Sequence, residues 1–71
     1  MLIDYTYTCK EIYEYLYTSP YKYADTIVYI DGLSHTPLEL INLGRMKVRL
    51  YDIKSEDNYT NYMFTLLKGG E

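Results

Sequence analysis

Thr8-Cys-Lys-Glu-Ile-Tyr-Glu-Tyr-Leu-Tyr17 is the stretch that decides the fold, because it joins a helix start signal to an amphipathic pattern. Thr8 and Glu11 form a capping box, in which each side chain accepts a hydrogen bond from the other residue's backbone amide. Ser19-Pro20 ends the pattern, since a residue that precedes proline is driven out of the helical conformation. We therefore predict a helix over residues 8–18. Its apolar residues recur at i, i+3, i+4, i+7 and i+8 and are Cys9, Ile12, Tyr13, Leu16 and Tyr17.

The helix stripe needs a sheet to cover it, and the rest of the chain supplies strand patterns. The 71 residues suffice for one small domain, 1–71, with residues 68–71 as a flexible tail. We predict the α+β class: a small, mostly antiparallel sheet of three or four strands packed on one amphipathic helix (8–18), with a short second helix at 37–43. The expected strands are 2–7, 26–30, 46–53 and 59–67, and the run 26–30, apolar on both faces, is the expected central strand.

Asp31-Gly32 follows the expected central strand and is open to two interpretations. Asp-Gly is typical of a tight hairpin turn, which would return a strand through Leu33 to Leu38. Thr36-Pro37-Leu38-Glu39 instead matches a helix start, with Gly44 as the terminator. We favour the helix, because a proline inside a paired strand would lose a ladder hydrogen bond.

The two C-terminal strands most simply form an antiparallel hairpin around the polar turn 54–58. In the first, Met46, Val48 and Leu50 share one face, while Arg45, Lys47 and Arg49 share the other. In the second, the apolar face comprises Tyr62, Phe64 and Leu66.

Charge, hydropathy and cysteine content limit the classes of function. The net charge of −3 argues against a general nucleic-acid binder, whose phosphate contacts need a basic excess. No apolar run is long enough to span a membrane, and Met1-Leu2-Ile3-Asp4 lacks the basic start of a signal peptide. A single cysteine cannot form an internal disulfide, which fits a reducing cytoplasm. We therefore expect a cytoplasmic protein with no membrane association.

The sequence contains no signature of catalysis, metal binding or cofactor binding, so we expect no enzyme activity, no metal and no cofactor. Cys9 and His35 are the sole thiol and imidazole. Cys9 lies on the apolar stripe of the helix, where a small buried thiol is ordinary, rather than beside a histidine that could activate it. A structural zinc site would need four such ligands.

Tyrosine is the unusual residue, with eleven of the twelve aromatic side chains. Eleven hydroxyl groups cannot all be buried without partners, so many rings should lie at the surface, where tyrosine supplies contact area at low entropic cost. AT-rich codon usage is a compatible explanation of the excess. Carboxylates beside tyrosines could engage a basic surface of another protein. The residues we expect in this patch are Tyr13, Glu14, Tyr15, Tyr21, Tyr23 and Asp25.

A second candidate surface lies on the expected strand 46–53, where cations recur at every other residue. Such charges often serve only to prevent sheet-to-sheet aggregation. They could also meet an acidic patch of a partner protein, or the phosphates of single-stranded nucleic acid whose bases stack on tyrosine. The residues concerned are Arg45, Lys47, Arg49 and Tyr51.

In size, acidity and tyrosine content the whole chain resembles accessory proteins of phages and mobile elements, such as anti-CRISPR inhibitors. This resemblance rests on no motif and implies no functional residues. It implies a small non-enzymatic protein that binds and inhibits a host protein, such as a nucleic-acid-handling defence complex. Single-stranded nucleic-acid binding through the basic strand is the alternative, which we rank below a protein partner. A homodimer, in which the tyrosines serve self-association, is also open.

Overall fold

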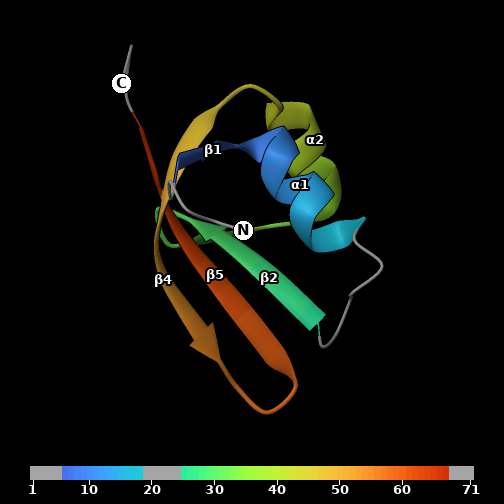
Figure 1. Ribbon diagram of the computed structural model, residues 1–71, viewed down its shortest axis with the longest axis vertical. Coiled ribbons are helices and arrows are strands. Elements are labelled where there is room, and N and C mark those ends of the chain that lie inside the picture. The colour runs from blue at the N-terminus through green and yellow to red at the C-terminus, as the bar shows by residue number, and fades with distance from the viewer. Residues whose placement is uncertain (1–5, 19–24, 68–71) are drawn as a thin grey trace.

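A computed structural model describes residues 6–18 and 25–67, which form a layer of helices against one face of a sheet (Figure 1). The predicted tail 68–71, the first residues of the strand predicted at 2–7, and the loop containing Tyr21 and Tyr23 lie outside the described residues. In chain order the elements are β1 (Thr6–Thr8), α1 (Cys9–Tyr17), β2 (Asp25–Ile30), β3 (Leu33–His35), α2 (Pro37–Leu43), β4 (Lys47–Ser55) and β5 (Tyr59–Leu66).

The predicted α+β class is confirmed, but the sheet differs from the prediction in its strand number and pairing. Within the described residues five strands form one sheet, in the order β1-β4-β5-β2-β3. Three of the four pairings are antiparallel, whereas β2 and β5 run parallel, with Asp25 opposite Tyr59 and Ile30 opposite Phe64. The central strand is therefore β5 rather than the predicted run 26–30, which forms β2 one place from the middle. The sheet is mixed because the chain crosses over through β3, α2 and β4 before it returns beside β2.

The predicted start of α1 is confirmed. The Glu11 amide donates to Thr8 Oγ1 (3.2 Å), and the Thr8 amide donates to Glu11 Oε1 (2.8 Å). The next two helix amides find partners that the local sequence does not reveal: Cys9 donates to the Met46 carbonyl (2.9 Å) and Lys10 to the Gly44 carbonyl (3.0 Å). The turn that ends α2 thus completes the N-terminal cap of α1, so the two helices are joined by hydrogen bonds.

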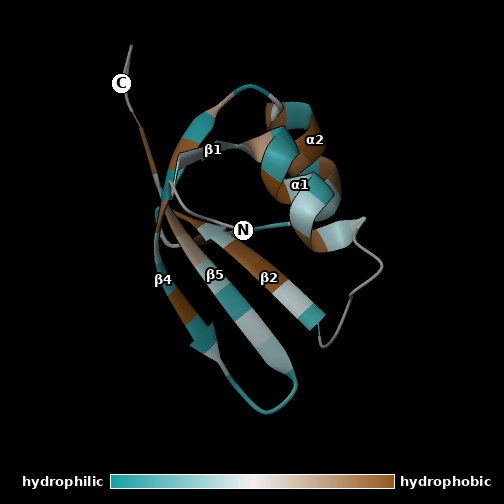
Figure 2. Cartoon of the chain, in the orientation of Figure 1, coloured by the Kyte–Doolittle hydropathy of each residue, from teal (hydrophilic) through white to brown (hydrophobic). Residues whose placement is uncertain are grey.

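The core lies between α1, α2 and one face of the sheet. Cys9 and Ile12 of the predicted stripe are buried, and Tyr13, Leu16 and Tyr17 are partly buried at its margin. Figure 2 shows the alternation of hydrophobic and hydrophilic residues along β4 that gives this strand one inward face. The buried residues that complete the core are Tyr7, Val28, Ile30, Leu40, Val48, Leu50 and Phe64.

Both interpretations of Asp31-Gly32 prove compatible, because β3 is only three residues long. Asp31 (φ 52°) and Gly32 (φ 85°) both adopt left-handed conformations, as a type I′ hairpin turn requires. The predicted second helix then begins directly after β3. Thr36 forms a second capping box with Glu39, Pro37 occupies the first turn, and the chain leaves the helix at Gly44.

A β-bulge interrupts the alternation predicted for 46–53. Leu50 lies opposite Phe64, but the next residue of β5, Met63, lies opposite Asp52, so β4 carries one extra residue near Tyr51. The bulge shifts the phase of all later residues and places Ile53 on the helix side with its cross-strand partner Tyr62. Asp52 Oδ1 accepts a hydrogen bond from the Ile53 amide (2.8 Å), so this amide of β4 has a partner in the neighbouring side chain.

Asp31 has a second role, which couples the β2–β3 turn to β5. Its amide donates to the Phe64 carbonyl (2.9 Å). Its Oδ1 accepts from the Leu66 amide and from Thr65 Oγ1, both at 3.1 Å. One carboxylate thus binds the end of the central strand while its own backbone makes the tight turn.

We expect Asp31→Ala to lower the free energy of unfolding by about 2 kcal/mol, because alanine resists a left-handed conformation and cannot accept the two hydrogen bonds. Asp31→Asn is the matched control. Asparagine tolerates this conformation and keeps the acceptor oxygen. We therefore expect Asp31→Asn to lower the free energy of unfolding by about half as much as Asp31→Ala, or less. Urea denaturation followed by circular dichroism measures both values, and equal losses in the two variants would contradict this role of Asp31.

Candidate functional site

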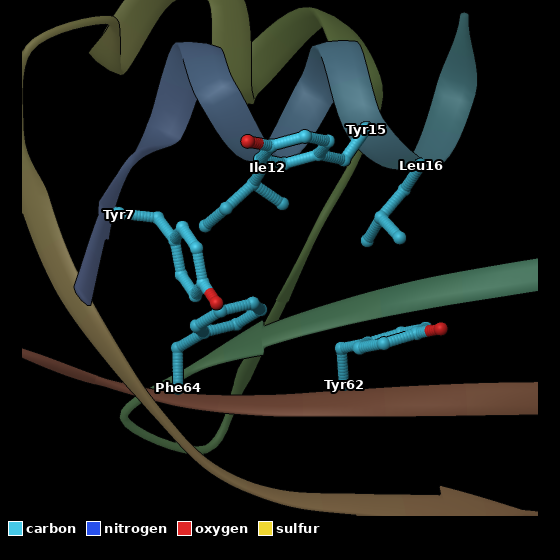
Figure 3. Close-up of a pocket in the computed structure, with 6 residues that line it drawn as sticks. All are labelled: Tyr7, Ile12, Tyr15, Leu16, Tyr62 and Phe64. Carbon is cyan, nitrogen blue, oxygen red and sulfur yellow. The ribbon is translucent and has the colours of Figure 1, made fainter. Parts of the chain in front are cut away.

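A shallow apolar hollow opens between α1 and the sheet (Figure 3). It encloses about 10 Å³, enough for roughly one water molecule. Figure 3 shows side chains that reach down from α1 and others that rise from β5, with one ring entering from β1. We call this surface the tyrosine groove, and its lining residues are Tyr7, Ile12, Tyr15, Leu16, Tyr62 and Phe64.

Tyr15 forms the exposed wall of the tyrosine groove, with 52% of its surface accessible. Its ring packs edge-to-face on Tyr7, with centroids 6.2 Å apart at 82°. Tyr7 in turn packs edge-to-face on the buried ring of Phe64, at 6.4 Å and 90°. This chain of rings holds Tyr15 from beneath while one side of it stays open to solvent, so its apolar surface is presented in a fixed orientation.

Ile53 of β4 lies on the same side of the sheet as the tyrosine groove. It is the cross-strand partner of Tyr62, so the two side chains share the helix side of the sheet. The far end of the β4–β5 hairpin extends past both helices (Figure 1), and 46% of Ile53 is accordingly exposed. Tyr15 and Tyr62 line the tyrosine groove, and Ile53 lies beside Tyr62 on the same side of the sheet.

The structure does not bring the predicted patch residues of α1 into one cluster. Tyr13 and Tyr15 point about 200° apart around the helix. Tyr13 packs on Tyr17, with ring centroids 6.2 Å apart, and the Tyr17 hydroxyl donates to the Thr26 carbonyl (2.9 Å). Burial raises the pKa of Tyr17, because the charged phenolate loses its hydration there. Tyr13 therefore packs on Tyr17, which bonds to β2, and it does not line the tyrosine groove.

The remaining predicted patch residues are dispersed. Glu14 is exposed beside Tyr15, and its backbone carbonyl accepts from Thr18 Oγ1 (2.6 Å). Asp25 is exposed at the start of β2. Tyr21 and Tyr23 lie outside the described residues. Sequence reasoning missed Tyr62, Leu16 and Ile53 as site residues: it assigned the first two to the core, and no local signal reveals the bulge that turns Ile53 toward α1.

The predicted basic residues also separate. Lys47 and Arg49 project from β4 on the face opposite the buried Val48 and Leu50, as predicted. Arg45 lies in the turn after α2 rather than in the strand. Tyr51 lies at the bulge and is 58% exposed.

Lys54, which we predicted in the turn, lies in β4 instead. Its cross-strand partner is Asn61, whereas the partner of Arg49 is Thr65. Both partners alternate with the inward-facing residues of β5, so Lys54 shares the outward face with Arg49.

Cys9 and His35 do not meet. Cys9 follows β1 at one edge of the sheet, whereas His35 ends β3 at the opposite edge. The thiol is fully buried, and this burial raises its pKa. His35 Nδ1 donates to the Leu33 carbonyl (2.8 Å). Over residues 6–18 and 25–67, no three His, Cys, Asp or Glu side chains are grouped so that they could hold a metal ion.

No protein-family model matches the chain, and no curated protein or solved structure is similar enough to count as a match. Among the described residues, no helix has the length and apolar character needed to cross a membrane.

We expect Cys9 to react with a thiol reagent only when the domain opens. Because the thiol is fully buried and its pKa is raised, labelling by Ellman's reagent in buffer should be at least about a hundredfold slower than in denaturing urea. Absorbance of the released thionitrobenzoate measures both rates. Equal rates would show that the α1 stripe does not pack against the sheet.

Proposed function

We propose that this chain is a non-enzymatic interaction protein that binds one partner protein through the tyrosine groove and acts by occupying that partner's surface. The observation that carries the proposal is the apolar tyrosine groove, in which Tyr15 packs on Tyr7 yet stays exposed, with the exposed Ile53 beside Tyr62 on the same side of the sheet. Aromatic residues held in this way are the common energetic centres of protein interfaces.

The size of the hollow supports a macromolecular rather than a small-molecule ligand. Small-molecule sites usually enclose about 300–1,000 Å³, whereas the tyrosine groove holds about 10 Å³. A broad partner surface can cover Tyr15 and Ile53 without entering a cavity.

Charge supports a basic partner. Glu14 lies next to Tyr15 on α1, and Glu56 and Asp57 lie at the tip of the β4–β5 hairpin, all three exposed. Carboxylates around an apolar centre favour encounter with a positively charged surface. Proteins that handle nucleic acid carry such surfaces, so we propose a host protein of this kind, in the cytoplasm, with the chain acting as an inhibitor in the manner of phage accessory proteins and anti-CRISPRs.

The test is affinity capture from the native host, followed by titration of the purified partner against defined variants. We expect Tyr15→Ala and Ile53→Ala each to weaken binding, with the tyrosine change costing at least about thirtyfold. Ile41→Ala on α2 is the matched control, because Ile41 is 45% exposed and Ile53 is 46% exposed. Isothermal titration calorimetry gives the dissociation constants.

The proposal fails if Ile41→Ala weakens binding as much as Ile53→Ala, or if no host protein is captured. Circular dichroism and thermal melting must show that each variant is folded. Sedimentation equilibrium of the free protein tests the homodimer: loss of a dimer in Tyr15→Ala would assign the tyrosine groove to self-association.

A further inference from the structure

The sheet face that lies opposite the helices carries a second, chemically different surface. Side chains that alternate with the buried core residues point to this face, which neither α1 nor α2 covers (Figure 1). At its centre Tyr29 of β2 lies in register with Met63 of β5, and Ile27 lies in register with Asn61. All four are partly buried and share this face of the sheet, and we call them the platform.

A row of three cations borders this platform along β4. Lys47, Arg49 and Lys54 are exposed and share the outward face, the last of them because the bulge at Tyr51 shifts the phase of the strand. None of the three forms an ion pair with a carboxylate of the described residues. Their charges therefore remain available to an anionic ligand.

Two carboxylates lie on or near this face and keep their negative charge: Asp52 between Arg49 and Lys54, and Asp31 beside Thr65, so the three cations of β4 outnumber them. Asp52 Oδ1 accepts from the Ile53 amide, and Asp31 Oδ1 accepts from the Leu66 amide and Thr65. Asp25 lies at the far end of β2, two strands away from the cations of β4. The other described carboxylates belong to the helices and to the hairpin tip, so the net charge of −3 is not spread evenly over the molecule.

Aromatic rings adjoin the cations. Tyr51 lies at the bulge between Arg49 and Lys54 and is 58% exposed. Tyr59 begins β5 and alternates with the inward-facing Tyr62 and Phe64, and 45% of it is exposed. Tyr59 and the partly buried Tyr29 lie on this face and Tyr51 lies at its β4 margin, where nucleobases could stack while a phosphate backbone follows the row of cations.

We propose that this open face binds single-stranded nucleic acid: Lys47, Arg49 and Lys54 contact phosphates, and Tyr51, Tyr59 and Tyr29 stack with bases. An acidic protein would satisfy the cations but would leave the aromatic platform unexplained, whereas a single strand uses both. Because this surface and the tyrosine groove lie on opposite sides of the sheet, the inference does not depend on the proposed function.

The test is fluorescence anisotropy of the purified full chain with a fluorescein-labelled, 20-nucleotide single-stranded oligodeoxynucleotide at low salt. We expect a dissociation constant on the order of 10 μM. A log–log plot of the association constant against salt concentration should have a slope of about −2, because three phosphate contacts to a single strand each contribute about −0.7.

Alanine substitutions test whether binding depends on the named residues of this face or only on the total positive charge of the protein. Lys47→Ala/Arg49→Ala/Lys54→Ala should weaken binding at least about tenfold, and Tyr51→Ala/Tyr59→Ala at least about fivefold. Lys47→Ala/Arg49→Ala is compared with the control Lys10→Ala/Arg45→Ala, which also removes two cations but takes them from α1 and the turn after α2 and should change binding less than about twofold.

Competition decides the class of ligand. The inference is overturned if no saturable binding occurs at low salt, or if the control variant loses as much affinity as Lys47→Ala/Arg49→Ala. It is also overturned if poly-glutamate competes as well as the oligonucleotide, which would indicate an acidic protein, or if a duplex of the same sequence binds as tightly as the single strand. The triple variant should still capture the host protein. Nucleic-acid binding and binding through the tyrosine groove can therefore fail independently.

Discussion

The fold depends on the packing of one short apolar stripe, centred on Cys9 and Ile12 of α1, against the face of the sheet that carries Val28, Val48 and Phe64. These residues come from four separated elements, so this contact holds the helix, the central strand and both of its neighbours together. A chain of this length buries only about 60–65% of its unfolded surface. Over the described residues, its two helices therefore cover one face of the sheet and leave the other without a helix (Figure 1). The tyrosine groove lies at the margin of the covered face, and the cations of β4 lie on the other face.

Much of the fold is encoded by local signals. Both capping boxes, at Thr8 and at Thr36, were predictable because each depends on residues three apart in the sequence. The β4–β5 hairpin followed from alternation and a polar turn. The parallel pairing of β2 with β5 was not predictable in this way, because it joins segments separated by two strands and a helix, and no local pattern specifies such a partner. The hairpin and the helix predicted after Asp31-Gly32 are both present, because β3 has only three residues and leaves room for α2.

The candidate site was less predictable than the fold, for a geometrical reason. Sequence indicated that tyrosines would be exposed, and Tyr15 is. Residues that are neighbours along the chain do not form one patch, because helix residues two apart point in nearly opposite directions and Tyr13 packs on Tyr17 instead. Tyr62 lines the groove with Tyr15, and Ile53, whose direction depends on the bulge near Tyr51, lies beside Tyr62. A single inserted residue therefore decides which side chains of β4 face the helix and which cations share the open face.

The division of charge between the two sides of the sheet follows from the same architecture. β4 carries mostly cations on the sheet face that neither α1 nor α2 covers. The described parts of the helices carry mostly carboxylates. A protein partner seated in the tyrosine groove would leave the open face unobstructed, because the thickness of the sheet separates them. The molecule could thus hold a protein on one side and a nucleic-acid strand on the other. Such an arrangement would suit an inhibitor of a complex in which protein and nucleic acid are already close together.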